Sequence, residues 1–169
     1  EYPYFIHPIS DGIPRMDPDV IRATRDLIVS SVDWSQVDLI LSVEAMGLPL
    51  LAAVGDATGK PTVVVRKRSY GMEGETRVDV ATGYSQSTVY INDIKAGERI
   101  VIVDDVISTG GTLEPLIQQL EDMGVILQDI VIAIEKGEGR ERLNREKPHW
   151  PIRSLARIDI IDGKVEIVG

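Results

Sequence analysis

Apolar positions along the chain follow two alternating patterns, short runs of aliphatic residues and longer segments with an apolar stripe at helical spacing. The first pattern is typical of strands buried on both faces, and the second of helices that pack one face on a core. In residues 17–31 the helical stripe consists of Val20, Ile21, Leu27 and Ile28. Together the patterns predict helices at 17–31, 47–58 and 113–123, and strands at 37–43, 62–66, 87–91, 99–103, 130–135, 152–161 and 164–168.

The order of these elements indicates the fold class. Short apolar strands that alternate with helices are characteristic of α/β folds with a mainly parallel central sheet. Residues 69–86 are polar and contain glycines, which predicts a mobile loop or an exposed hairpin. Asp162 and Gly163 predict a tight turn between the last two strands. The 169 residues are enough for one domain, 1–169, with its own core.

Composition then narrows the chemistry. The sequence holds 18 Lys and Arg against 27 Asp and Glu, a formal net charge of −9. We therefore expect no nucleic-acid partner, because duplex binding depends on surplus basic charge, and an anionic metabolite would need a local binding device. The absence of Cys excludes disulfides and thiol nucleophiles and favours a cytoplasmic protein. The longest aliphatic run, 130–134, is far shorter than the ~20 residues of a membrane span, so we expect no membrane association.

Segment 99–113, RIVIVDDVISTGGTL, carries the strongest chemical signal. A buried strand places Asp104 and Asp105 at its carboxyl end, where ligands bind in open α/β sheets. In the following loop, 108–112, glycines let backbone N–H groups approach an anion, and the next helix N-terminus favours a phosphate. We expect the Thr112 side chain to cap that helix. Two acids beside a phosphate cradle fit a sugar phosphate, with hydroxyls or Mg²⁺ at the acids and the phosphate at the amides.

This segment resembles the 5-phosphoribosyl-1-pyrophosphate (PRPP) motif of type I phosphoribosyltransferases. The strings YFIHPISDGIP, VEAMGLPL, VVRKRSYG, TGYS and RIDIIDG resemble the archaeal hypoxanthine or hypoxanthine/guanine phosphoribosyltransferases, which are similar in layout to adenine phosphoribosyltransferases. The resemblance implies a type I phosphoribosyltransferase fold with a flexible active-site loop and a small hood formed by about residues 1–16 and the C-terminal strands. It also implies purine salvage, in which PRPP and hypoxanthine or guanine give IMP or GMP and pyrophosphate.

Roles for individual residues follow from the resemblance. Asp104 and Asp105 are implied to be catalytic, to hold the ribose hydroxyls and to meet Mg²⁺ only through substrate or water. The implied PRPP-binding residues are Val106, Ile107, Ser108, Thr109, Gly110, Gly111 and Thr112. The implied pyrophosphate-binding residues are Glu44, Ala45, Met46 and Gly47 in one loop, with Arg66 and Lys67 from the basic run at 66–68.

The remaining implied features concern the purine and the assembly. Tyr4 and Phe5 are candidates to lie over the purine in the hood, and Lys136 is a candidate to reach the purine oxygen. Tyr84 and Ser85 are candidates in the active-site loop. The family also implies Mg²⁺ as cofactor and a homodimer. We expect His7 to be structural and not catalytic.

One position departs from the pattern of hypoxanthine-guanine enzymes. Bacterial and eukaryotic members carry an Asp at the position of Ser108, near the purine N7, as a proton acceptor, whereas adenine-type enzymes have a small neutral residue there. A neutral Ser cannot act as that base, so adenine stays open as an alternative substrate and the general base is unassigned. An alternative of another class is a PRPP-sensing transcription regulator on the same fold, which would need a DNA-binding helix-turn-helix or a basic surface.

Overall fold

The computed structural model describes residues 4–13, 15–81 and 86–169. Its helices are α1 (Pro18–Ser31), α2 (Leu48–Thr58), α3 (Leu113–Asp122) and α4 (Gly139–Glu146), and a 3-10 turn, η1 (Trp34–Gln36), follows α1. Its strands are β1 (Leu39–Val43), β2 (Thr62–Val65), β3 (Thr76–Ala81), β4 (Gln86–Ile91), β5 (Arg99–Ile107), β6 (Ile126–Lys136), β7 (Ile152–Ile161) and β8 (Lys164–Ile167). No helix within these ranges is long and apolar enough to cross a membrane.

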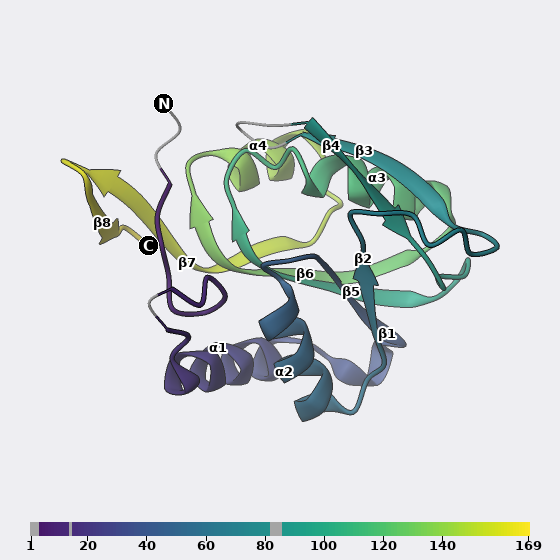
Figure 1. Ribbon diagram of the computed structural model, residues 1–169, viewed down its shortest axis with the longest axis horizontal. Coiled ribbons are helices and arrows are strands. Elements are labelled where there is room, and N and C mark those ends of the chain that lie inside the picture. Colours follow the sequence, from purple (N-terminus) through teal and green to yellow (C-terminus); the bar gives the residue numbers. More distant parts are fainter. Residues whose placement is uncertain (1–3, 14, 82–85) are drawn as a thin grey trace.

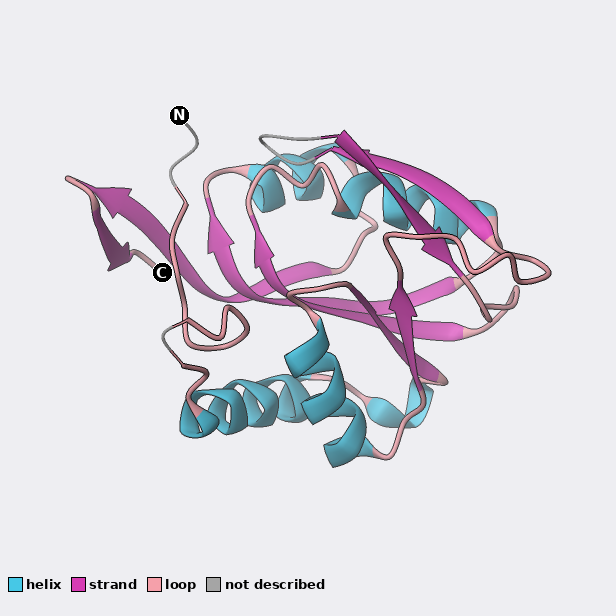
Figure 2. Ribbon diagram, viewed as in Figure 1, coloured by secondary structure: helices cyan, strands magenta, loops and turns pink. Residues whose placement is uncertain are grey.

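These elements form three layers (Figures 1 and 2). The middle layer is a six-stranded sheet in the order β2-β1-β5-β6-β7-β8, in which β8 pairs antiparallel with β7 and the other neighbours are parallel. Helices α1 and α2 cover one face, and α3, α4 and the antiparallel β3–β4 pair lie over the other. The α/β class with a mainly parallel sheet, predicted from the sequence, is confirmed.

Strand β5 shows why the central strands are apolar throughout. Ile100 and Ile102 belong to the core on the α3 side, whereas Val101 and Val103 belong to the core under α1 and α2. Successive side chains of a strand point to opposite faces, so a strand between two helix layers needs apolar residues at every position. The same alternation continues to the carboxyl end of β5, where the two acids follow.

Local sequence signals account for several boundaries. The Asp17 carboxylate caps α1 by accepting hydrogen bonds from the backbone N–H groups of Asp19, at 2.9 Å, and Val20, at 3.3 Å. Asp162 and Gly163 both have positive φ, 50° and 74°, as the predicted tight turn between β7 and β8 requires. The predicted apolar stripe of α1 was wrong at Leu27, whose side chain is 56% exposed.

Three parts of the chain differ from or sharpen the sequence prediction. Strand β5 continues to Ile107, so both acids lie within the strand and not after it. Residues Thr76–Ala81, in the polar stretch 69–86, form β3, which pairs antiparallel with β4, so part of this stretch belongs to a two-stranded sheet with the strand predicted at 87–91. Helix α4 was not predicted, because Leu143 is the one aliphatic residue in its sequence GRERLNRE and it has no apolar stripe to detect.

Candidate active site

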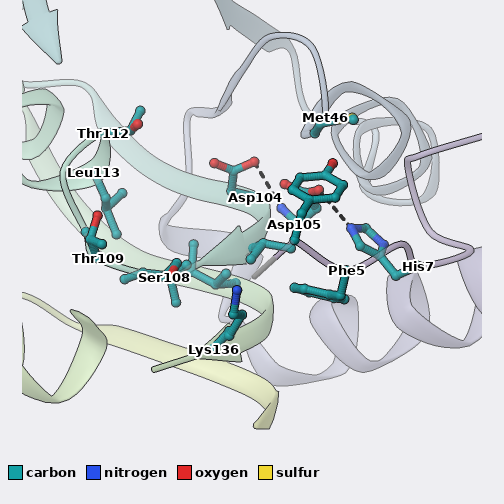
Figure 3. Close-up of a pocket in the computed structure, with 15 residues that line it drawn as sticks. Phe5, His7, Met46, Asp104, Asp105, Ser108, Thr109, Thr112, Leu113 and Lys136 are labelled. Carbon is teal, nitrogen blue, oxygen red and sulfur yellow. Dashed lines mark hydrogen bonds and ion pairs between the residues drawn. The ribbon is translucent and has the colours of Figure 1, made fainter. Parts of the chain in front are cut away.

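The carboxyl ends of β5 and β6 and the N-terminal segment enclose a cavity of about 200 Å³ (Figure 3). From the motif, residues 104–110, Thr112 and Leu113 line the cavity. From elsewhere in the chain come Tyr4, Phe5, His7, Met46, Ile132 and Lys136. The fold therefore brings the PRPP motif, one residue of the expected pyrophosphate loop and all three purine candidates together in one place.

The two motif acids occupy different environments although they are adjacent. Removal from water, together with the negative charge of Asp105, raises the pKa of Asp104 well above its ordinary value. Burial also acts to raise the pKa of Asp105, but hydrogen bonds from His7 and Ser10 outweigh that effect, and the pKa is lowered. Asp105 is therefore the member of the pair that the protein holds as a carboxylate.

The loop after β5 has the open backbone expected of a phosphate cradle, but its details differ from the prediction. Gly110 has φ of 80°, a conformation that favours glycine, and its carbonyl accepts the N–H of Glu114 at 2.9 Å. Thr112 stands at the N-cap of α3, but its side chain makes no capping hydrogen bond, so the predicted cap was wrong. A side chain reaches the free N–H groups of the first helical turn when its own residue has extended φ and ψ angles. Thr112 instead has the backbone conformation of the helix itself.

Gly111 is needed for contact with the hairpin. Its carbonyl accepts the Ala81 N–H at 3.0 Å, and a Cβ at Gly111 would lie 2.0 Å from the Ala81 carbonyl oxygen. Gly111 is not among the residues lining the cavity in the described part of the chain. The assignment of Gly111 to PRPP binding stays a prediction. Close packing against Ala81 of β3 is a second reason why this position holds a glycine.

Helix α4 supports the phosphate loop from behind. The Gly139 N–H donates to the Ser108 carbonyl at 2.9 Å, and Arg142 Nη2 donates to the Thr109 carbonyl at 3.3 Å. A Cβ at Gly139 would lie 2.1 Å from the Ser108 carbonyl oxygen, so the backbones touch there. Sequence reasoning missed these residues, because the signal is a lone glycine at the start of a helix that has no apolar periodicity.

The expected pyrophosphate loop, 44–47, connects β1 to α2 beside the acids. Met46 lines the cavity, and a Cβ at Gly47 would lie 2.6 Å from Asp104 Oδ1, so the loop backbone lies close to that carboxylate. The Glu44 carboxylate instead pairs with Arg66, 3.3 Å from Nη1, and accepts the Lys67 N–H. Among the described residues, the cavity lining does not include Glu44, Ala45, Gly47, Arg66 or Lys67. Their roles at pyrophosphate stay predictions for a neighbouring surface.

The side of the cavity expected to hold the base combines aromatic and cationic groups. Lys136 ends β6 and is buried, and its Nζ lies 5.8 Å from the centre of the Phe5 ring (Figure 3). The neighbouring Glu135 is fully buried and accepts hydrogen bonds from Ser154, at 2.8 Å, and Arg140. The predicted placement of Lys136 at a strand end is thus found. Tyr84 and Ser85 lie outside the described residues.

His7 and Ser10 are site residues whose contacts the sequence did not reveal. His7 Nε2 lies 3.2 Å from Asp105 Oδ2, and Ser10 Oγ donates to the same oxygen at 2.8 Å (Figure 3). Ser10 and Asp105 are 95 positions apart, and His7 is still further from Asp105 in the sequence. No spacing rule connects such distant residues, so no sequence pattern could have found these contacts.

The sequence of this chain is similar to a known protein family and to curated proteins. A family model described as "Phosphoribosyl transferase domain" matches residues 13–154. The hypoxanthine/guanine phosphoribosyltransferase of Methanocaldococcus infernus is 48% identical over 167 residues, which cover 99% of this chain and 91% of that protein. The protein of the same name from Ferroglobus placidus is 47% identical over 168 residues, covering 99% and 88%.

Among solved structures, adenine phosphoribosyltransferase from Thermoanaerobacter pseudethanolicus superimposes with a TM-score of 0.72 at 26% identity, covering 83% of this chain and 82% of that one. The enzyme of the same name from Leishmania tarentolae has a TM-score of 0.73 at 22% identity, covering 83% and 72%, a likeness of fold alone.

Proposed function

The chain belongs to the phosphoribosyl transferase domain family, and we propose that it is a purine salvage enzyme that transfers the 5-phosphoribosyl group of PRPP to hypoxanthine or guanine. The products are IMP or GMP and pyrophosphate. Relatives at 44–48% identity that span nearly the whole chain carry the name hypoxanthine/guanine phosphoribosyltransferase, which supports the enzyme class and the purine. The resemblance noted from the motif and the flanking strings is consistent with that assignment.

One observation carries the proposal: two acids, a glycine-containing anion loop and an aromatic wall line the same cavity. We assign Asp104 and Asp105 to the ribose hydroxyls and the loop 108–112 to the 5-phosphate. Phe5 and Tyr4 supply flat apolar surface on which a purine can stack. Although the protein is acidic overall, a phosphate in this loop would meet local positive charge from the backbone N–H dipoles and from the N-terminus of α3.

In this assignment the enzyme acts mainly by positioning and by charge stabilisation. The bond from the anomeric carbon to the pyrophosphate oxygen breaks as the bond to the purine nitrogen forms, the imidazole ring of the purine releases its N–H proton, and positive charge develops on the ribose ring in the transition state. A carboxylate held near that ring stabilises the charge more strongly than water does, because it needs no reorganisation during the reaction. Asp105, whose pKa is lowered by its hydrogen bonds despite burial, is suited to that role.

We propose that Mg²⁺ arrives with PRPP as part of the substrate. Within the described ranges, no three His, Cys, Asp or Glu side chains gather where they could hold a metal ion. Mg²⁺ keeps several waters and often binds through substrate phosphates, so two acids that meet it through substrate or water fit this behaviour. Its role there is to neutralise charge on the pyrophosphate oxygens.

The purine preference rests on Lys136. A buried ammonium beside the Phe5 ring can donate to the exocyclic oxygen of hypoxanthine or guanine, whereas adenine presents an amino group at that position. Adenine is the second candidate, because Ser108 is neutral and the solved structures of similar fold cited above are adenine enzymes. We also propose that residues 4–16 and the β7–β8 strands form the hood of one domain.

We further propose that the protein works as a cytoplasmic homodimer and has no nucleic-acid partner. Large apolar side chains that stand exposed on the N-terminal segment and on β8, such as Ile13 and Ile167, support an interface between copies. The net charge of −9 argues against a duplex partner.

The proposal is tested by incubating the purified protein with PRPP, Mg²⁺ and hypoxanthine. We expect IMP and pyrophosphate in equal amounts, and loss of both when Mg²⁺ is chelated. If no purine gives a product and the protein instead binds DNA in a sequence-specific manner, it is the transcription regulator.

A further inference from the structure

The N-terminal segment crosses the carboxyl end of β5 and contacts one of the two motif acids. His7 Nε2 and Ser10 Oγ both reach Asp105 Oδ2, at 3.2 and 2.8 Å. Figure 3 shows the His7 ring facing the Asp105 carboxylate. Neither contact uses Asp105 Oδ1, and a carboxylate can accept further hydrogen bonds at that oxygen.

The alternation of side chains along β5 explains why Asp105 is the acid that is held. Asp105 follows Val101 and Val103 on the face that packs under α1 and α2. Ile9 belongs to that same core, so the chain on either side of it is brought against this face. Asp104 lies on the opposite face, where the Gly47 backbone approaches it.

Burial makes these contacts strong. His7 is 8% exposed, Ser10 is 9% exposed and Asp105 is 6% exposed. Water competes little for such groups, and a hydrogen bond to a buried charge is worth more than one at the surface. Among the described residues, the buried Nδ1 of His7 has no hydrogen-bond partner, so Nε2 is the ring nitrogen through which His7 contacts the protein and reaches Asp105.

A third carboxylate, that of Asp11, stabilises the N-terminal segment. It accepts the His7 backbone N–H at 2.8 Å and the Tyr4 hydroxyl at 3.0 Å, and His7 Nε2 lies 3.5 Å from the same carboxylate. The segment therefore has internal bonds that fix the His7 ring independently of any ligand. Such preorganisation lowers the ordering cost when a ligand binds.

We propose that His7 and Ser10 are positioning residues for PRPP binding, which hold Asp105 Oδ2 so that Oδ1 is aimed at the ribose hydroxyls. This inference rests on the proposed function, because it takes Asp105 as a ribose-binding group. It gives His7 a role beyond the packing role expected from the sequence. It also predicts that damage to this contact affects PRPP and leaves the purine step intact.

The test is the dissociation constant for PRPP with Mg²⁺, measured by titration calorimetry. We expect Ser10→Ala and His7→Leu each to weaken binding by about tenfold, since each removes a hydrogen bond to a buried carboxylate. His7→Gln retains an N–H donor near the position of Nε2 and should restore binding to within about threefold of the starting protein. The KM for hypoxanthine at saturating PRPP should change by less than about twofold in all three.

A double-mutant cycle separates positioning from general packing. In an Asp105→Ala background, His7→Leu and Ser10→Ala should have no further effect on PRPP binding, because the group they act through is gone. Thr24→Val is the matched control, since Thr24 is 8% exposed and its hydroxyl donates to the Val20 carbonyl at 2.8 Å within α1. That variant should bind PRPP normally.

Each outcome is decisive. If Asp105→Ala weakens PRPP binding but Ser10→Ala and His7→Leu do not, the positioning role is overturned and the proposed function stands. If the two variants weaken binding equally with and without Asp105, their role is packing, and the inference also fails. If the starting protein does not bind PRPP, the proposed function itself is wrong. Should His7→Leu fail to fold, the nearly isosteric Ser10→Ala still decides.

Discussion

One wall of the cavity, residues 104–112, is almost a single uninterrupted stretch of chain. The opposite wall is formed by Tyr4, Phe5 and His7, in an N-terminal segment whose Ser10 contacts Asp105 from 95 positions away. The functional groups of the first wall are local in sequence: two adjacent acids, a glycine with positive φ and the N-terminus of α3. The second acts through side chains that matter only because the fold delivers them to Asp105. The first wall is proposed to contact the ligand directly, whereas His7 and Ser10 are proposed to hold one of its carboxylates in place.

The largest effect should come from breaking the contiguous wall itself. Replacing both Asp104 and Asp105 by Asn removes the charge assigned to the ribose, and we expect turnover to fall by at least about 10³-fold. Circular dichroism should be unchanged, because both side chains lie at the cavity. Asp56→Asn, at an exposed site on α2, is the matched control. Normal turnover in the double variant would remove the ribose assignment.

A break in the support of that wall should cost less. In Gly139→Ala the new Cβ would meet the Ser108 carbonyl at 2.1 Å and displace the loop. A displacement of about 1 Å can cost roughly 10²-fold, so we expect the KM for PRPP to rise by about that factor. Gly169→Ala, where the nearest atom is 3.6 Å away, should behave like the starting protein. A folded Gly139→Ala protein with an unchanged KM would show that the loop does not depend on α4.

Lys136 lines the cavity but belongs to neither of these two walls. Lys136→Met removes the proposed donor to the purine oxygen, and a hydrogen bond from a charged group supports a loss of about 10- to 100-fold in kcat/KM for hypoxanthine. The value for adenine should fall much less, so the preference between the bases narrows. Steady-state kinetics with both bases measure this directly, with Lys164→Met as an exposed control. Equal losses for both bases would argue against the donor role.

The smallest effect should come from Arg142. Its Nη2 donates to the Thr109 carbonyl at 3.3 Å and also pairs with Glu114 at 2.7 Å. Arg142→Met removes one hydrogen bond from the phosphate loop at a partly exposed site, and we expect the KM for PRPP to rise about fivefold. The KM for hypoxanthine should not change. A rise confined to hypoxanthine would place Arg142 on the wrong side of the cavity.

The sequence predicted much of the fold because its central strands lie between two layers and must be apolar at every position. The last hairpin was predicted from Asp162 and Gly163, whereas the cap that Asp17 provides to α1 was found in the structure. Helix α4 was missed since its stability depends on tertiary contacts of a single buried leucine, Leu143. Leu27 was misplaced because a helical stripe predicts one face but not its width.

The site was predictable to the extent that its chemistry is local. The adjacent acids and the loop after them could be identified from their order, and the structure places nearly all of them at one cavity. The contacts of His7, Ser10 and Gly139 were not predictable, because each depends on which distant backbone lies beside it. Gly111 illustrates the same limit, since its close neighbour is Ala81 on the hairpin.

The cavity is proposed to join PRPP to a 6-oxopurine. The most direct measurement is kcat/KM for hypoxanthine, guanine, adenine and xanthine, compared side by side with saturating PRPP and Mg²⁺. We predict that hypoxanthine or guanine is used at least about tenfold better than adenine, a difference of about 1.4 kcal/mol in transition-state binding. A preference for adenine would contradict both the role proposed for Lys136 and the assignment of hypoxanthine or guanine as the substrate.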